Sequence, residues 1–199
     1  MPGPLPRFSP LHLWMALELI GRHGRVGRKQ LARMMKIGEG SVRTILERMS
    51  KLGLVRSLRG GSSLTEKGRR VLGSLPRVIE ADLRYLSLAK KSAVTVVPGG
   101  APRVSSGIEQ RDAAVRAGGR GATVLIFRNG RLRFPDGLEV EREADKILSL
   151  ASPSEDDAVL IGFGDDGVSA RLAAMAAAVS LLPPKVLREL EGRGPAAGE

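Results

Sequence analysis

Two short amphipathic stretches joined by a tight turn restrict the fold of this chain more than any other feature. Apolar side chains recur at helical spacing in residues 28–35, RKQLARMM, and again in residues 38–52, GEGSVRTILERMSKL. The glycines of KIGEG favour a turn between the two helices. Because each helix has a single apolar face, both must pack on a further element, and we expect a helix over residues 11–22 to supply it.

A β-hairpin is predicted over residues 54–64. The stretch LVRSL alternates like a strand, RGG reverses the chain, and SSLT returns. Thr65 is the predicted N-cap of the next helix, and a further helix is predicted from residue 76 to 88. Three helices, a hairpin and another helix are the order of a winged helix-turn-helix, which we expect over residues 1–90.

The positive charge of the chain is concentrated in its first half. Residues 1–91 contain 19 Lys and Arg against 6 Asp and Glu, and residues 92–199 contain 13 against 15. The halves therefore carry +13 and −2 of the total of +11. A concentrated positive field suits a polyanion such as nucleic acid, and a merely solubilising surface is the alternative.

Two further features of composition limit the class of protein. The chain has no cysteine, which excludes disulfides and thiolate metal sites. No apolar run reaches the roughly 18 residues that predict a membrane span. We therefore expect a cytoplasmic protein without a membrane partner.

The predicted helix over residues 38–52 has a polar, cationic face that suits the major groove of DNA. Arginine can donate two hydrogen bonds to guanine, and threonine can reach a base or a phosphate. Gly40 allows close approach of the helix start, although a plain turn residue is the alternative. We predict a sequence-specific transcriptional regulator that contacts double-stranded DNA through this helix and the wing at 54–64. The predicted contacts are Arg28, Lys29, Gly40, Ser41, Arg43, Thr44, Arg48, Arg56 and Arg59.

Longer stretches carry a resemblance to a known family. GRKQLARMMKIGEGSVRTILERMSKLGLV, followed by SLTEKG, resembles the winged-helix domains of archaeal transcriptional regulators. VSSGIEQRDAAVRAGGRGATVLIFRNGRLRFP and VLIGFGDDGVSARLAAMAAAVSLL resemble the uncharacterised domain that follows this winged helix in one archaeal family of predicted regulators. The resemblance covers most of residues 10–182, and it implies a regulator without implying any ligand or chemistry.

Strands and helices alternate in the second half, which predicts a small α/β domain of about four strands over residues 91–185. The chain as a whole is then of the α+β class. Apolar strands are expected at residues 92–97, 122–127 and 158–164. Helices are expected at residues 104–117, 139–150 and 168–182. Ser106 and Glu109 fit a capping box at the start of the first of these helices, and residues 186–199 are expected to be a disordered tail.

Two stretches of the second half are candidate ligand sites. Arg111 falls on the apolar face of its predicted helix with Ile108 and Val115, where an unpaired charge is costly. It either pairs with an acidic neighbour or binds an anionic effector, and Arg120 could join it in that candidate effector site. In GFGDDG, residues 162–167, an aspartate caps the next helix or the glycines admit a phosphate.

The sequence contains no recognisable catalytic constellation, so we predict neither an enzyme nor a cofactor. The two histidines, His12 and His23, do not share a helix face, and we predict no metal site. A homodimer is expected because winged helices often bind paired half-sites. The alternative function is an enzyme or metabolite-binding domain fused to a winged helix that serves as a protein-interaction module.

Overall fold

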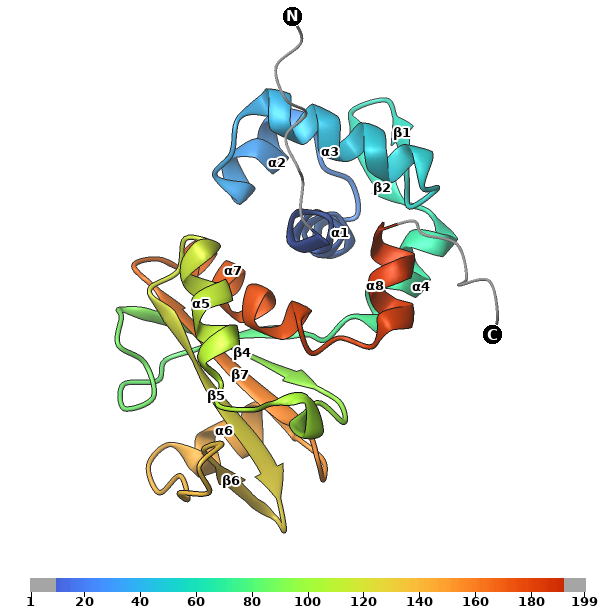
Figure 1. The fold of residues 1–199 in the computed structure, drawn as a ribbon. Helices are drawn as coiled ribbons and strands as arrows, with labels where there is room; N and C mark the ends of the chain where they lie inside the picture. Colours follow the sequence, from blue (N-terminus) through green and yellow to red (C-terminus); the bar gives the residue numbers. More distant parts are fainter. Residues whose placement is uncertain (1–9, 192–199) are drawn as a thin grey trace, which may run out of the picture. The chain divides into compact units, whose positions relative to one another are not determined.

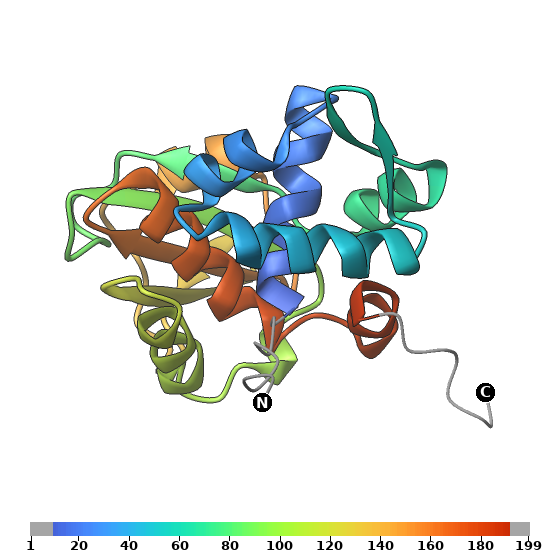
Figure 2. The same cartoon turned by 90° about the horizontal axis from the view of Figure 1, so that it is seen from above.

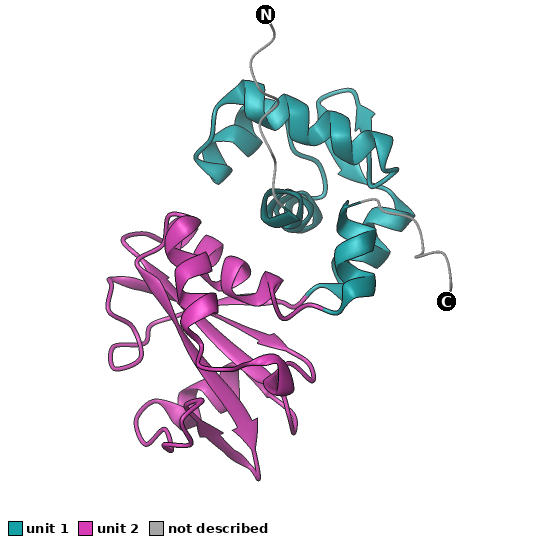
Figure 3. Ribbon diagram, in the orientation of Figure 1, with its two compact units in different colours: residues 1–75, 183–199 teal, residues 76–182 magenta. Residues whose placement is uncertain are grey.

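The computed structural model of the chain describes residues 10–191, and the chain divides into two compact units (Figure 3). Unit 1 comprises residues 1–75 and 183–199, and unit 2 comprises residues 76–182. The boundary therefore lies between residues 75 and 76, and not at residue 90 as predicted. The difference is about one short strand and a loop. The chain also returns to unit 1 after unit 2, which the sequence did not predict.

The described residues of unit 1, 10–75 and 183–191, form three helices, a two-stranded wing and two more helices (Figure 1). In chain order these are α1 (Pro10–His23), α2 (Arg28–Met35), α3 (Glu39–Lys51), β1 (Val55–Leu58), β2 (Gly61–Leu64), α4 (Glu66–Ser74) and α8 (Pro184–Glu191). Helix α1 is the centre of the unit and contacts α2, α3, α4 and α8. In Figure 2, α3 crosses in front of α1. Of the apolar residues that recur at helical spacing in α3, Val42, Ile45 and Met49 are buried and Leu46 is half-buried.

The wing is an antiparallel hairpin in which Arg56 pairs with Ser63 and Ser57 pairs with Ser62. A bridge ties it to the segment between α1 and α2, because Val26 and Ser62 exchange two backbone hydrogen bonds of 3.0 and 2.9 Å. At Gly61 the backbone has φ +147°, and a Cβ there would lie 2.6 Å from the carbonyl oxygen of Val26. Only glycine fits at this crossing. This arrangement confirms the predicted winged helix-turn-helix.

Thr65 caps α4 as predicted. Its Oγ1 accepts a hydrogen bond from the backbone N–H of Gly68 at 3.0 Å. Because an N-cap hydroxyl satisfies an otherwise unpaired amide, we expect Thr65→Ala to lower the free energy of unfolding by about 1 kcal/mol. Urea unfolding followed by circular dichroism measures the change. Thr65→Ser keeps the hydroxyl and is expected to retain most of the stability, so equal losses in the two variants would contradict the capping role.

Two predictions about unit 1 and its borders are wrong. Residues 184–191 form helix α8, which packs on α1 and α4, where a disordered tail was predicted from 186. Residues 192–199 of that predicted tail lie outside the described residues. The helix predicted over 76–88 does not form either, because residues 78–81 pair with β4 as a strand. This pairing with a distant strand overrides the helical spacing of the apolar residues.

Unit 2 is built on one five-stranded sheet with the order β3-β4-β7-β5-β6. Its elements are β3 (Val78–Ala81), β4 (Lys91–Val97), a 3-10 helix (Ala101–Arg103), α5 (Ile108–Arg116), β5 (Gly121–Arg128), β6 (Arg131–Arg133), α6 (Ala144–Ala151), β7 (Ala158–Gly164) and α7 (Gly167–Val179). Every neighbouring pair of strands is antiparallel. Strands β4 and β5 run parallel to each other, joined through α5, and β7 lies between them in the opposite direction. The chain is α+β as predicted, with five strands in place of about four.

The two faces of this sheet are covered differently. Helices α5 and α7 lie on one face (Figure 1), and on the other Ile147 of α6 joins a core with Val94, Val159 and Ile161. Under α7, Gly162 is paired with Ala93 on one side and Ala122 on the other. A Cβ at Gly162 would overlap the backbone nitrogen of Ala174. This row of small residues explains why α7 is rich in alanine and approaches the sheet so closely.

The loop between β3 and β4 is held by a carboxylate from the start of α6. Glu143 accepts hydrogen bonds from the backbone N–H groups of Arg84, Tyr85 and Leu86 at 2.6, 3.0 and 3.1 Å. In a helix, these amides would instead donate to backbone carbonyl oxygens one turn earlier in the chain. The contact is therefore a second reason that residues 82–88 are not helical.

The start and the faces of α5 also differ from the prediction. The helix begins at Ile108 after Gly107, and the predicted capping box of Ser106 and Glu109 does not form. Ile108 and Val115 are 52 % and 51 % exposed, whereas Gln110 and Ala114 are buried. The predicted apolar face of this helix is therefore wrong. The helix predicted over 139–150 begins later, at Ala144.

Candidate nucleic-acid interface

The outward face of α3 presents a guanidinium held by a neighbouring carboxylate. Arg43 donates a hydrogen bond from Nε to Oε1 of Glu47 at 2.8 Å, one turn further along the helix. This hydrogen bond and the charge of Glu47 raise the pKa of Arg43. The Arg43 side chain is 68 % exposed. Since the contact uses Nε, both Nη groups of Arg43 remain available to donate to other acceptors.

A groove of about 510 Å³ lies between this face of α3 and one face of the wing. Its cationic lining comes from Arg28, Arg43 and Lys51, with Glu47 beside Arg43. Serine hydroxyls complete the polar lining at Ser50, Ser57 and Ser62. Arginine, lysine and hydroxyl groups are the usual donors to phosphate oxygens. Lys51 was not among the predicted contacts, although its spacing of eight residues from Arg43 places both on one helix face.

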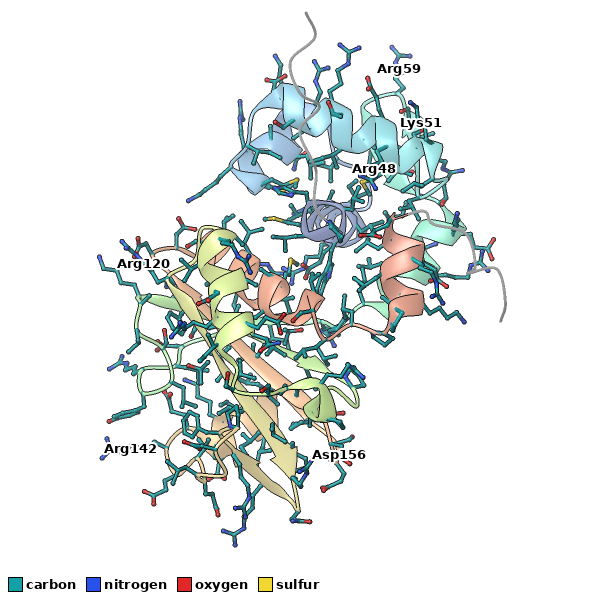
Figure 4. The ribbon with its side chains drawn as sticks, viewed as in Figure 1. Arg48, Lys51, Arg59, Arg120, Arg142 and Asp156 are labelled. Carbon is teal, nitrogen blue, oxygen red and sulfur yellow. The ribbon has the colours of Figure 1, made fainter. Side chains whose placement is uncertain are left out.

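Arg48 does not lie on this surface. The side chain is half-buried, and its Nη2 donates a hydrogen bond to the carbonyl oxygen of Glu191 in α8 at 3.3 Å (Figure 4). The structure thus directs Arg48, one of the predicted DNA contacts, toward α8 and not toward the groove. Its position beside the buried stripe of α3 turns it toward α8, whose existence the sequence did not indicate.

The two arginines of the wing point to different places. Arg59 is exposed at the turn of the hairpin (Figure 4). Arg56 alternates with Ser57 along β1, so it faces away from the groove beside α3 and donates from Nε to Ser63 Oγ at 3.4 Å. The structure thus brings Ser57, and not Arg56, to the groove beside α3.

The start of α2 adds cations next to α3. Arg28 lies 3.6 Å from a carboxylate oxygen of Glu39, the first residue of α3, and both side chains are about half exposed. Lys29 is exposed, and no residue between 10 and 191 forms an ion pair with it. This pair of cations supports the predicted phosphate contact at the beginning of α2.

The first turn of α3 has an open backbone. Gly38 is the N-cap and supplies no side-chain acceptor, and a Cβ on Gly40 would meet nothing within 4 Å. Ser41 and Thr44 follow on the same side, half-buried, and Thr44 donates from Oγ1 to the carbonyl oxygen of Gly40 at 3.2 Å. Residues 10–191 therefore give no packing reason for glycine at position 40.

The two arginines of the candidate effector site each contact an aspartate in unit 2. Arg111 is exposed and pairs with Asp112 at 3.0 Å. Arg120 pairs with Asp165 at 2.8 Å and 3.1 Å through two nitrogen atoms (Figure 4 shows its outward position). Arg111 therefore has the acidic neighbour that was one of its two alternatives, and Arg120 has an acidic partner as well. Binding of an anionic effector stays a prediction. Asp166, in the same GFGDDG turn, caps α7 as one reading of the sequence had it.

The Arg120–Asp165 pair has a consequence for the pKa of Asp165 and for the stability of the fold at low pH. The hydrogen bond from Arg120 is the largest influence that lowers the pKa of Asp165, and the charges of Arg120 and Lys90 add to it. A carboxylate with a lowered pKa stabilises the fold above its ordinary pKa, and this contribution is lost as the pH falls through the folded value. We expect Arg120→Ala to raise the pKa of Asp165 in a carboxyl NMR titration. Arg116→Ala, in the same unit but without an ion pair among the described residues, is the control. An unchanged pKa of Asp165 in Arg120→Ala would contradict the pairing.

Residues 10–191 contain no group of three or more His, Asp or Glu side chains placed to hold a metal ion. In the same range, no helix has the length and apolar character needed to span a bilayer.

Comparisons with known proteins give matches in both halves of the chain. Residues 88–181 match the family described as "Domain of unknown function (DUF4443)", and residues 18–70 match "PH0730-like, N-terminal domain". A solved structure, "Hypothetical protein PH0730 from Pyrococcus horikoshii OT3", is 25 % identical with a TM-score of 0.71, over 92 % of this chain and 100 % of that one. Among curated proteins, none matches the chain. The chain is thus similar, nearly from end to end, to an archaeal hypothetical protein, and its two halves resemble a PH0730-like N-terminal domain and a domain of unknown function.

Proposed function

We propose that this protein is a sequence-specific DNA-binding transcriptional regulator that places α3 in the major groove. The observation that carries the proposal is the cationic groove between α3 and the wing, with Arg28, Arg43 and Lys51 in its lining. A recognition helix must bury one face and present the other, and α3 does both. A DNA backbone beside α3 would meet the cations and hydroxyls of the groove together.

The distribution of charge between the two units supports this proposal. Unit 1 contains 18 Lys and Arg against 7 Asp and Glu, and unit 2 contains 14 of each. The whole net charge of +11 thus belongs to the unit that carries α3 and the wing. Such a field attracts a polyanion to this unit and speeds encounter with it.

Arg43 is the residue best suited to read a base. Glu47 fixes the guanidinium through Nε, so less rotamer entropy is lost when the Nη groups bind guanine O6 and N7. A carboxylate on a DNA-facing helix also repels phosphate. Glu47 therefore favours a docking geometry in which Arg43 faces the bases, and it disfavours binding by charge alone.

The open first turn of α3 fits close approach to DNA. The first N–H groups of a helix lack partners inside the helix, and here the N-cap supplies no side-chain acceptor. Such amides bind phosphate oxygens. The absence of a Cβ at Gly40 leaves room for a DNA strand beside them.

Selection of bound duplexes from random DNA by the full chain tests the proposal. We expect one enriched sequence, and a plot of log affinity against log salt concentration with a slope of about −0.9 for each neutralised phosphate. Fluorescence anisotropy between 50 and 200 mM salt measures the slope. A chain that enriches no sequence, and that fails to bind duplex at 50 mM salt, is not a DNA-binding regulator.

A further inference from the structure

A second groove lies on the other face of the wing, within unit 1. It has a volume of about 840 Å³ and is walled by the end of α1, the wing and α4. This volume lies in the range of small-molecule sites. Its apolar lining comes from Ile20, Leu58, Leu64 and Leu72. Leu58 is 38 % exposed, so the groove offers apolar surface to an occupant.

Three arginines line this same groove, namely Arg25, Arg56 and Arg69. Each donates only to a neutral oxygen: Arg25 to the carbonyl of Arg59 at 3.3 Å, Arg56 to the hydroxyl of Ser63 at 3.4 Å, and Arg69 to the carbonyl of Leu64 at 3.2 Å. None of the three forms an ion pair with a carboxylate in the described part of the chain. By contrast, Arg22, Arg43, Arg111, Arg120, Arg128 and Arg131 each have one.

We propose that this groove binds a small amphipathic anion, with a carboxylate or phosphate head among the three arginines and an apolar body on the leucines. Guanidinium groups bind both kinds of head through paired hydrogen bonds, and the charge on the ligand strengthens them. The apolar part gains from leaving water at Leu58 and Leu72. Neither a bare ion nor an uncharged hydrocarbon uses both parts of the groove. This inference does not depend on DNA binding.

Gly73 offers a way to fill the groove without disturbing the fold. It lies in the wall of the groove and inside α4, and a Cβ there would meet nothing within 4 Å. A leucine at this position therefore takes up groove space and has a higher helix propensity than glycine. Gly73→Leu is the blocking variant. Arg69→Gln removes one cation of the groove, and Arg70→Gln, on the same helix outside the groove, is its matched control.

Calorimetric titration of the full chain with decanoate and with decyl phosphate, both below their micelle-forming concentrations, tests the proposal. Acetate and inorganic phosphate supply the heads alone, and decanol supplies the apolar body alone. We expect one equivalent of at least one amphiphile to bind, about tenfold more tightly than any of the partial ligands. Whichever of the two amphiphiles binds more tightly identifies the head that the arginines prefer.

The variants locate the binding. We expect Gly73→Leu to abolish it, Arg69→Gln to weaken it about tenfold and Arg70→Gln to leave it unchanged. Circular dichroism confirms that each variant is folded, and Arg69→Gln carries the test if Gly73→Leu is not. The proposal is overturned if neither amphiphile binds, or if binding is the same in wild type and the two groove variants. Binding of decanol as tight as that of the tighter amphiphile would also overturn it.

Discussion

Replacement of Arg43 with glutamate is expected to lower the affinity of the full chain for its selected duplex about 100-fold. The change removes a guanidinium that is 68 % exposed on the outward face of α3, and it places a carboxylate beside Glu47. A bidentate contact with guanine is worth about 1–3 kcal/mol, and two neighbouring carboxylates then repel the phosphates as well. Fluorescence anisotropy at fixed salt measures the loss.

The control for this prediction is Arg70→Glu. It makes the same change in charge within unit 1, on α4, away from the groove beside α3. A long-range field alone would weaken binding equally in both variants, whereas direct contact predicts only a few-fold loss in Arg70→Glu. Equal losses would show that Arg43 acts through net charge, and an unaffected Arg43→Glu would remove α3 from the interface.

Gly162→Ala is expected to lower the free energy of unfolding by about 3 kcal/mol, at the upper end for an overpacked core. The added methyl group would overlap the backbone of α7 at Ala170 and Ala174. Backbone atoms cannot rotate away as a flexible side chain can, so α7 must move off the sheet. That movement opens contacts along the small-residue row of Ala93, Gly162 and Ala122.

Gly167→Ala is the matched control for this second prediction. Gly167 is the first residue of α7 and lies in the same unit, and a Cβ there would meet nothing closer than 3.8 Å. Urea unfolding followed by far-ultraviolet circular dichroism compares the two variants. If Gly162→Ala were as stable as Gly167→Ala, the close approach of α7 to the sheet would be wrong.

Local patterns in the sequence were sufficient to predict most of unit 1. Helical spacing located α2 and α3, the alternation of LVRSL located β1, and Thr65 marked the start of α4. Each of these signals lies within the element that it predicts. The end of α1 and the turn of the wing are likewise marked by glycines with positive φ, at Gly24 and Gly60.

Predictions that depended on distant segments failed. Residues 78–81 have apolar spacing that fits a helix, but their partner β4 lies in a later part of the chain. On α5, Gln110 faces inward because its Nε2 donates to Ser180 Oγ at 3.0 Å, after α7. No signal near either segment reports such a partner, so burial was assigned to the wrong residues.

The same contrast between local signals and distant partners holds for the residues of the candidate site. The exposed positions of Arg43, Lys29 and Gly40 could be predicted from the outward face of α3 and the start of α2. The position of Arg48 could not be predicted, because its acceptor is in α8, which follows the whole of unit 2 in the chain. The sequence could, however, have predicted that Arg56 and Ser57 lie on opposite faces of the wing, because successive residues of a strand point to opposite faces.

Because side chains alternate along the wing, its two faces line different grooves and can be substituted independently of each other. Ser57 and Ser62 line the groove beside α3, and Arg56, Leu58 and Ser63 line the groove beside α4. A substitution in β1 therefore alters one groove and leaves the chemistry of the other intact. A one-residue insertion or deletion within β1 exchanges the two faces, since it turns every later side chain of the strand over. Across relatives of this chain, the hairpin should vary in residue type far more readily than in length.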